Sequence, residues 1–206
     1  MHRSTVVAIA LSFGLAGEAL AQATGTPSYN APYRAFTRSE FGAVLSFPNY
    51  DAGTAVEGVY RFASGQFDVG LRGGLAFPDG PADTEFLVGV EGRYRVLTHS
   101  ADFPLDGALI FGGGLQINNG TDFILPVGLS LGRRIQVENS QVSIVPYVQP
   151  TLFIVSADLG PFGRDTDARF GLGLGGDFRL SRAFDARLSI GVGDLDGIAI
   201  GAVWIH

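Results

Sequence analysis

Apolar side chains recur at every second position through most of the chain after residue 33, in runs of ten to fifteen residues separated by short turns. In residues 66–78 the apolar positions are Phe67, Val69, Leu71, Leu75 and Phe77, and the alternate positions are Asp68, Gly70, Arg72, Gly74 and Ala76. A period of two residues is typical of β-strands that have one apolar face. Repeated along the chain, it predicts an all-β protein folded as an antiparallel, up-and-down transmembrane β-barrel.

Ten strands are predicted, with turn-forming residues between them. Asn118-Asn119-Gly120 is one such turn. An even number of strands suits a barrel whose two ends lie on the same side, and eight strands remain an alternative if the first or the fifth prediction is wrong. The predicted strands form one domain, residues 33–206, and are 33–47, 54–64, 66–78, 84–97, 105–117, 122–134, 140–156, 166–180, 183–193 and 196–206.

The first 32 residues have no such alternation. Arg3 precedes an apolar run, Val6 to Ala16, that is too short to span a bilayer, and Ala19-Leu20-Ala21 offers the small residues that signal peptidase needs. We therefore expect a signal peptide over residues 1–21, and a flexible lead-in over residues 22–32. The chain has no Cys, which excludes disulfides and a lipid anchor on cysteine.

The residues between the apolar positions indicate which face of the barrel is outside. Over residues 166–180 they are Arg169, Gly171, Gly173, Gly175, Asp177 and Arg179. Small residues mixed with opposite charges suit a crowded lumen, whereas a wall in water usually carries Lys, Glu, Thr and Gln. Aromatic residues near strand ends, such as Tyr60 and Phe77, suit the girdles at a membrane interface. A soluble lipocalin-like carrier with the two faces reversed remains an alternative.

The polar face carries a set of charged residues in which acid and base lie two or four positions apart, so that cross-strand partners of opposite charge come within reach. One interpretation is a buried ion-pair network that fills the barrel, and the other is a narrow, charge-lined pore. The predicted members are Glu57, Arg61, Asp68, Arg72, Glu91, Arg93, Arg95, Arg169, Asp177, Arg179, Asp185 and Arg187.

Composition agrees with a membrane barrel. Charged residues make up 17% of the chain, against about 25% in average soluble domains. All 14 basic residues are Arg, whose guanidinium group pairs with carboxylates in two directions; a bias in base composition would give the same count. The net charge of −6 argues against a nucleic-acid partner.

The predicted outward turns are rich in Asp. Asp194 and Asp196 are weak candidates for a divalent cation that would bridge the rim to phosphates of the surrounding glycolipid. Asp is also a common turn residue, which accounts for the same pattern without a cation.

Candidate catalytic chemistry is sparse, and we expect neither an enzyme nor a cofactor. His99-Ser100-Ala101-Asp102 contains the residue types of a hydrolase triad, but adjacent residues of a loop do not form one. A lipid hydrolase would need a Ser and a His on the wall, and an adhesin would need longer outward loops than Ala157 to Asp167. The glycines of residues 171–176 lie within a predicted strand, where they let the wall bend around bulky lumen groups.

The last predicted strand alternates up to Trp204 and ends at His206. It resembles the carboxy-terminal assembly signal of the small outer-membrane barrels of Gram-negative bacteria, the group of OmpA-like and OmpX-like proteins, although members of that family typically end in Phe or Trp. The resemblance is architectural and covers essentially the whole mature chain. It implies insertion by the barrel-assembly machinery, contact with outer-membrane lipid and lipopolysaccharide, and a structural or narrow porin-like role.

Overall fold

The computed structural model describes residues 23–32, 38–48, 53–81 and 83–206. Ten long strands make up most of this part of the chain, together with the two-residue strand β7 (Ile135–Gln136) and a 3-10 turn at Gly160–Phe162. The long strands are β1 (Glu40–Pro48), β2 (Thr54–Ser64), β3 (Phe67–Phe77), β4 (Glu85–Leu97), β5 (Asp106–Ile117), β6 (Thr121–Gly132), β8 (Ser143–Asp158), β9 (Arg164–Arg179), β10 (Phe184–Gly193) and β11 (Gly197–Ile205).

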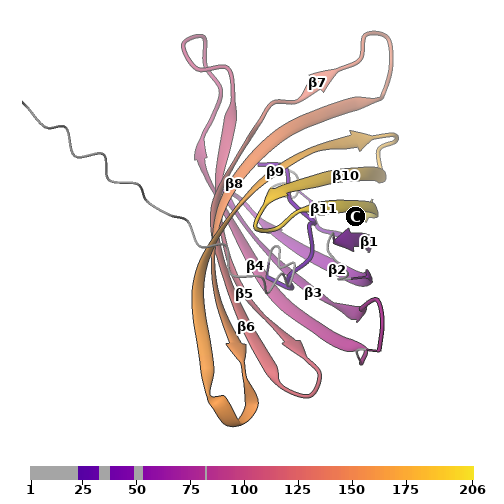
Figure 1. Cartoon of the computed structure of the whole chain (residues 1–206). Helices are drawn as coiled ribbons and strands as arrows, with labels where there is room; N and C mark the ends of the chain where they lie inside the picture. Colours follow the sequence, from indigo (N-terminus) through magenta and orange to yellow (C-terminus); the bar gives the residue numbers. More distant parts are fainter. Residues whose placement is uncertain (1–22, 33–37, 49–52, 82) are drawn as a thin grey trace, which may run out of the picture.

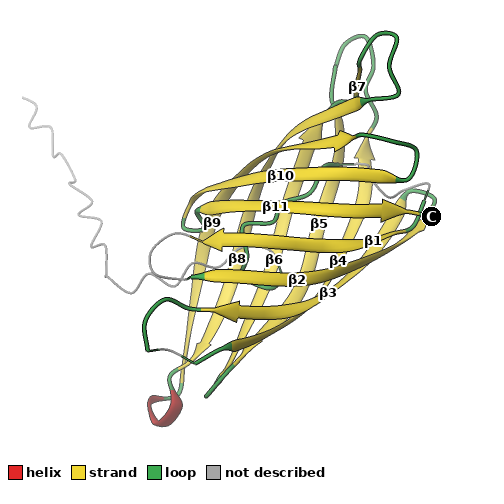
Figure 2. Cartoon of the chain, turned by 90° about the vertical axis from the view of Figure 1, so that its right-hand side faces the viewer, coloured by secondary structure: helices red, strands yellow, loops and turns green. Residues whose placement is uncertain are grey.

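The long strands close into a barrel (Figures 1 and 2). Each pairs antiparallel with its neighbours in sequence, and β1 pairs with β11 in a register that runs from Glu40 opposite Ile205 to Pro48 opposite Gly197. Strand β6 pairs with β8, while β7 adds only a short ribbon to β8. The predicted all-β antiparallel barrel of about ten strands is therefore confirmed.

Three strand boundaries differ from the prediction in an informative way. The first strand starts at Glu40 rather than at residue 33; residues 33–37 lie outside the described part. The expected outward loop from Ala157 to Asp167 is mostly a β-ribbon, because β8 continues to Asp158 and β9 begins at Arg164. Cross-strand hydrogen bonds extend this hairpin beyond the point where its apolar alternation ends.

The two faces of the barrel have opposite character. Large apolar side chains are exposed on the outside, among them Leu71 (59%), Phe86 (61%) and Phe170 (53%). Charged side chains are buried on the inside, among them Asp68 and Arg93, which are both fully buried. The soluble-carrier alternative expects the two faces reversed, whereas here the apolar side chains lie outside and the charged ones inside. Among the described residues there is no helix of the length and hydrophobicity needed to cross a membrane.

Residues 23–32 lie inside the barrel, where Figure 1 shows them as an indigo trace between the walls. All ten residues are buried. The expectation of a flexible lead-in is therefore wrong for this segment, which we call the plug. Its lack of alternation reflects contact with walls on several sides rather than absence of structure. The predicted signal peptide, residues 1–21, lies outside the described part of the chain.

Candidate functional site

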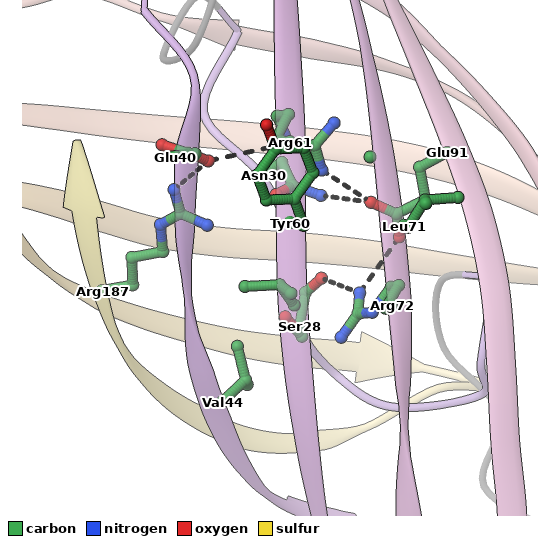
Figure 3. Close-up of a pocket in the computed structure, with 12 residues that line it drawn as sticks. Ser28, Asn30, Glu40, Val44, Tyr60, Arg61, Leu71, Arg72, Glu91 and Arg187 are labelled. Carbon is green, nitrogen blue, oxygen red and sulfur yellow. Dashed lines mark hydrogen bonds and ion pairs between the residues drawn. The ribbon is translucent and has the colours of Figure 1, made fainter. Parts of the chain in front are cut away.

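The lumen contains a branched ion-pair network built on β2, β3 and β4. Arg61 lies at its centre: its guanidinium nitrogens are 2.8 Å from Asp68 and 2.9 Å from Glu91, and its Nε is 3.7 Å from Glu40. Figure 3 shows Arg61 with Glu91 and Glu40. Glu40, Arg61 and Asp68 are all buried. A buried guanidinium is tolerated only where carboxylates surround it, and three of them do so here.

Two further arginines share the same carboxylates. Arg72 lies 2.7 Å from Glu57 and 3.0 Å from Glu91, and Arg93 lies 2.9 Å from Asp68. The strand register explains the grouping, because Asp68 is directly opposite Arg93 and residues of one face recur at every second position. Asp68 and Glu91 thus each bridge two guanidinium groups. The planar, multiply donating guanidinium group of Arg suits this arrangement better than the ammonium group of Lys would.

The network continues around the lumen to the last strands. Arg187 on β10 pairs with Glu40 on β1, and Arg179 on β9 lies 3.1 Å from Asp185 on β10. Asp177 is buried directly opposite Arg187 in the register. Arg95 and Arg169 are partly buried at positions in phase with the lumen face of β4 and β9. The structure thus places all twelve predicted residues on the inner face, and nine of them belong to the ion pairs described above.

Glu40 is a member of the network that sequence analysis missed. The expected first strand covers it, and it shares one face with Gly42, Val44 and Ser46, opposite Phe41 and Phe47. The two-residue period therefore contained the signal. It was obscured because, within Glu40–Pro48, that face has no other charge.

The plug contacts the network through its side chains. Thr24 and Thr26 donate hydrogen bonds to the two oxygens of Glu57, at 2.5 and 2.7 Å. Asn30 donates from Nδ2 to Glu91 at 3.3 Å. The sequence does not mark these residues as part of a site, because an uncharged segment without periodicity resembles a linker. Their shared polarity was the available signal.

An apolar region of the lumen accepts the ring of Tyr29. This ring belongs to a buried cluster with Ile124, Tyr147, Phe153 and Leu195. A Cβ added to Gly173 on β9 would overlap the Tyr29 ring, so the glycine there makes room for the plug. Gly175 makes room for Tyr147 in the same way. The predicted bending of the wall at residues 171–176 stays a prediction, whereas the structure shows that these two glycines leave space for bulky rings in the lumen.

Little free space remains beside the plug. Two cavities in the described part of the lumen have volumes of about 10 Å³ each, which is room for roughly one water molecule. One lies between Arg61, Glu91 and Asn30 (Figure 3), and the other between Asp177, Arg179 and Ala31. Within the described residues, the plug and the ion pairs thus occupy much of the lumen beside these two cavities.

The other candidate residues form no reactive arrangement. His99 Nδ1 lies 3.0 Å from Asp106, while the Ser100 hydroxyl accepts a hydrogen bond from the Phe103 amide. Asp194 accepts one from the Phe170 amide. Within the described residues, no three His, Asp or Glu side chains are grouped so that they could hold a metal ion. Asp194, in the β10–β11 turn, thus accepts a hydrogen bond from the neighbouring strand β9.

Aromatic side chains gather on the outer wall near the carboxyl terminus. Trp204 stacks on Phe41 with 6.0 Å between ring centroids and meets the edge of Phe184 at 5.2 Å. The His206 ring is 5.8 Å from Phe41 and 6.0 Å from Tyr60. The two residues of the predicted assembly signal therefore belong to one exposed cluster that spans β1, β2, β10 and β11.

Two comparisons with known proteins find no relative of this chain. A scan against protein-family models finds no match, and a search of curated proteins finds no similar sequence. These comparisons therefore support no family assignment, and functional interpretation depends on the described geometry.

Proposed function

We propose that this protein is an integral outer-membrane β-barrel with a structural role, non-catalytic and closed in its resting form. The observation that carries the proposal is the inverted distribution of side chains: apolar groups cover the outside, and paired charges fill the inside. Water on the outside would make that distribution unfavourable, whereas lipid makes it favourable.

The extent of the apolar surface favours a membrane over a soluble environment. Soluble monomers rarely expose a contiguous apolar patch larger than a few hundred Å². Here exposed apolar side chains occur on every long strand; examples are Phe41, Phe62, Leu71, Val90, Leu109, Leu125, Leu152, Leu174, Ile190 and Ile200. A closed barrel also satisfies the backbone hydrogen bonds of its wall, as a bilayer requires.

The filled lumen favours a structural role over an open porin. A ten-stranded barrel encloses little space, and here both the ion pairs and the plug occupy it. The remaining parts of the proposal rest on the sequence: export by the predicted signal peptide, insertion by the assembly machinery, and contact with outer-membrane lipid and lipopolysaccharide. An adhesin would present broad exposed loops, whereas the β8–β9 connection is a narrow ribbon.

The only Trp of the chain offers a direct test of membrane insertion. Trp204 is 46% exposed on the outer wall. In vesicles whose lipids carry bromine on the acyl chains, we expect its fluorescence to be quenched strongly, and acrylamide in the water to quench it weakly. Quenching by acrylamide alone would contradict the proposal.

A matched variant controls for non-specific contact with lipid. Trp204→Phe combined with Phe162→Trp moves the fluorophore to the tip of the β8–β9 ribbon, where Phe162 is 90% exposed. The tip extends beyond the apolar wall, so acrylamide should quench this variant more than brominated lipid does.

A further inference from the structure

The wall of the lumen holds the plug mainly by its main chain. Six carbonyl groups in residues 24–31 accept hydrogen bonds from wall side chains: Thr24 from Gln116 (3.1 Å), Pro27 from Ser189 (2.8 Å), Ser28 from Arg72 (3.5 Å), Tyr29 from Tyr147 (2.9 Å), Asn30 from Ser130 (2.6 Å) and Ala31 from Arg93 (2.6 Å). These donors come from β3, β4, β5, β6, β8 and β10. Recognition of carbonyl groups from all sides is how a site binds an extended polypeptide.

The plug does not belong to the hydrogen-bond ladder of the barrel. Its residues form no strand, and the ten long strands close on one another through the β6–β8 and β1–β11 pairings. Removal of the plug would thus leave the ladder complete. The groups that it uncovers, such as Arg72, Glu57 and Glu91, would face an aqueous channel and become hydrated.

Glycines in the wall provide the space for the plug. The atoms nearest to a Cβ placed on Gly89 belong to the plug, Thr24 Cγ2 at 2.9 Å and Ala23 Cβ at 3.0 Å. At Gly173 the three nearest atoms all belong to the Tyr29 ring. A side chain at either position would therefore collide with the plug before it collides with the wall.

From these observations we infer that residues 23–32 are a separable plug, bound in a polypeptide-binding lumen, and that their displacement opens a pore for small inorganic ions. The pore part of this inference rests on the proposed membrane function, whereas the binding of the plug in the lumen does not. The pore would be lined by charges of both signs, since Arg72 and Arg93 alternate around it with Glu57 and Glu91.

The test uses the mature chain with Gly89→Val and Gly173→Val together. Gly58→Val is the matched control, because a Cβ there points to the outer face and has its nearest neighbour, Gly73 O, at 3.8 Å. Tyr29→Ala is a second variant, which removes the plug's ring without altering the wall. A mobility shift on boiling in cold-SDS electrophoresis selects folded protein in each case.

The first readout needs no membrane. Ala31 is fully buried in the plug and the chain has no cysteine, so Ala31→Cys gives a single reporter thiol. In detergent, a charged maleimide should modify this thiol at least about tenfold faster in the double-valine or Tyr29→Ala background than in the parent or in the Gly58→Val variant. A loss of plug binding free energy equal to that of one or two hydrogen bonds would give a ratio of this size. Equal protection in all folded variants would overturn the inference.

The second readout is conductance in a planar bilayer with potassium chloride on both sides. We expect the parent and Gly58→Val to be silent and the displaced variants to give steps that a synthetic peptide of residues 22–32 blocks. If the reporter thiol reacts rapidly but the protein gives no conductance steps, although brominated lipid quenches its Trp204, the inference of a pore is overturned. Absence of that quenching would instead overturn the proposed membrane function, while the thiol rates would still decide whether the plug separates.

Discussion

Arg72 on β3 donates two hydrogen bonds to Glu57 on β2, from Nε to Oε1 at 3.2 Å and from Nη2 to Oε2 at 2.7 Å. The same two carboxylate oxygens accept the hydroxyls of Thr24 and Thr26 from the plug. Glu57 is thus the group at which the wall network and the plug meet, and its charge is needed by both.

Substitution of Glu57 by Gln should destabilise the folded protein. The variant keeps the side chain's volume but removes the charge that compensates a buried guanidinium, and breaking such a pair typically costs about 3 kcal/mol or more. Urea unfolding in lipid vesicles, followed by Trp204 fluorescence, measures this loss. Glu138→Gln, exposed in the β7–β8 connection, should change the free energy of unfolding by less than about 0.5 kcal/mol. Equal midpoints for the two variants would show that the Arg72–Glu57 pair contributes nothing.

Arginine at Leu174 should destabilise the barrel if the outer wall contacts lipid. Leu174 is 42% exposed on β9, and Arg near the middle of a bilayer costs about 2–4 kcal/mol. Leu159, 49% exposed at the tip of the β8–β9 ribbon, provides the control, since Leu159→Arg should be neutral. The comparison is made by urea unfolding in vesicles. A harmless Leu174→Arg would mean that this face does not contact hydrocarbon.

Removal of the Tyr147 hydroxyl should weaken the binding of the plug in the lumen. Tyr147 donates to the buried Tyr29 carbonyl at 2.9 Å, and a buried acceptor left without its donor costs about 1–3 kcal/mol. We expect this loss for Tyr147→Phe and none for Tyr60→Phe, because Tyr60 is 42% exposed on the outer wall. Thermal melting of the two variants side by side tests the difference, and identical melting would exclude a role for the hydroxyl.

The hairpin between β2 and β3 depends on Gly65. Its φ is 62°, and a Cβ there meets nothing within 4 Å, so any penalty comes from the backbone alone. Such a glycine at the first central position is typical of a two-residue type II′ turn. Gly65→Ala should therefore cost about 1 kcal/mol, and Gly65→Asn less. Gly58→Ala, within a strand, should be neutral or slightly stabilising, and a similar result for Gly65→Ala would contradict the assigned strain.

The wall of the barrel could be predicted from the sequence because one physical rule governs it. In residues 66–78, apolar side chains of the outer face alternate with small or charged side chains of the crowded inner face, and β3 spans Phe67–Phe77. The same alternation places Asp68, Arg72 and Arg93 on the inner face. Their specific partners could not be predicted, because pairing across strands depends on register, which the order of residues within one strand does not determine.

The plug could not be predicted for a different reason. Residues 23–32 are held by single contacts to many strands, such as Arg93 to Ala31 and Ser130 to Asn30, so no periodic pattern marks them. Their Thr, Ser, Asn and Pro content is also that of a disordered linker. Complementarity to a surface assembled from distant segments leaves little trace in local sequence.

The plug's position also constrains the order of folding. Its partners are distant along the chain: Thr26 and Glu57 are 31 residues apart, and Tyr29 and Leu195 are 166 apart. The complete binding surface therefore does not exist until strands from β2 to β11 have assembled, and contacts between such distant residues form slowly. Residues 23–32 are synthesised before every strand of the barrel, yet they are thus among the last to reach their native contacts. Substitutions within it should accelerate unfolding and leave the folding rate nearly unchanged.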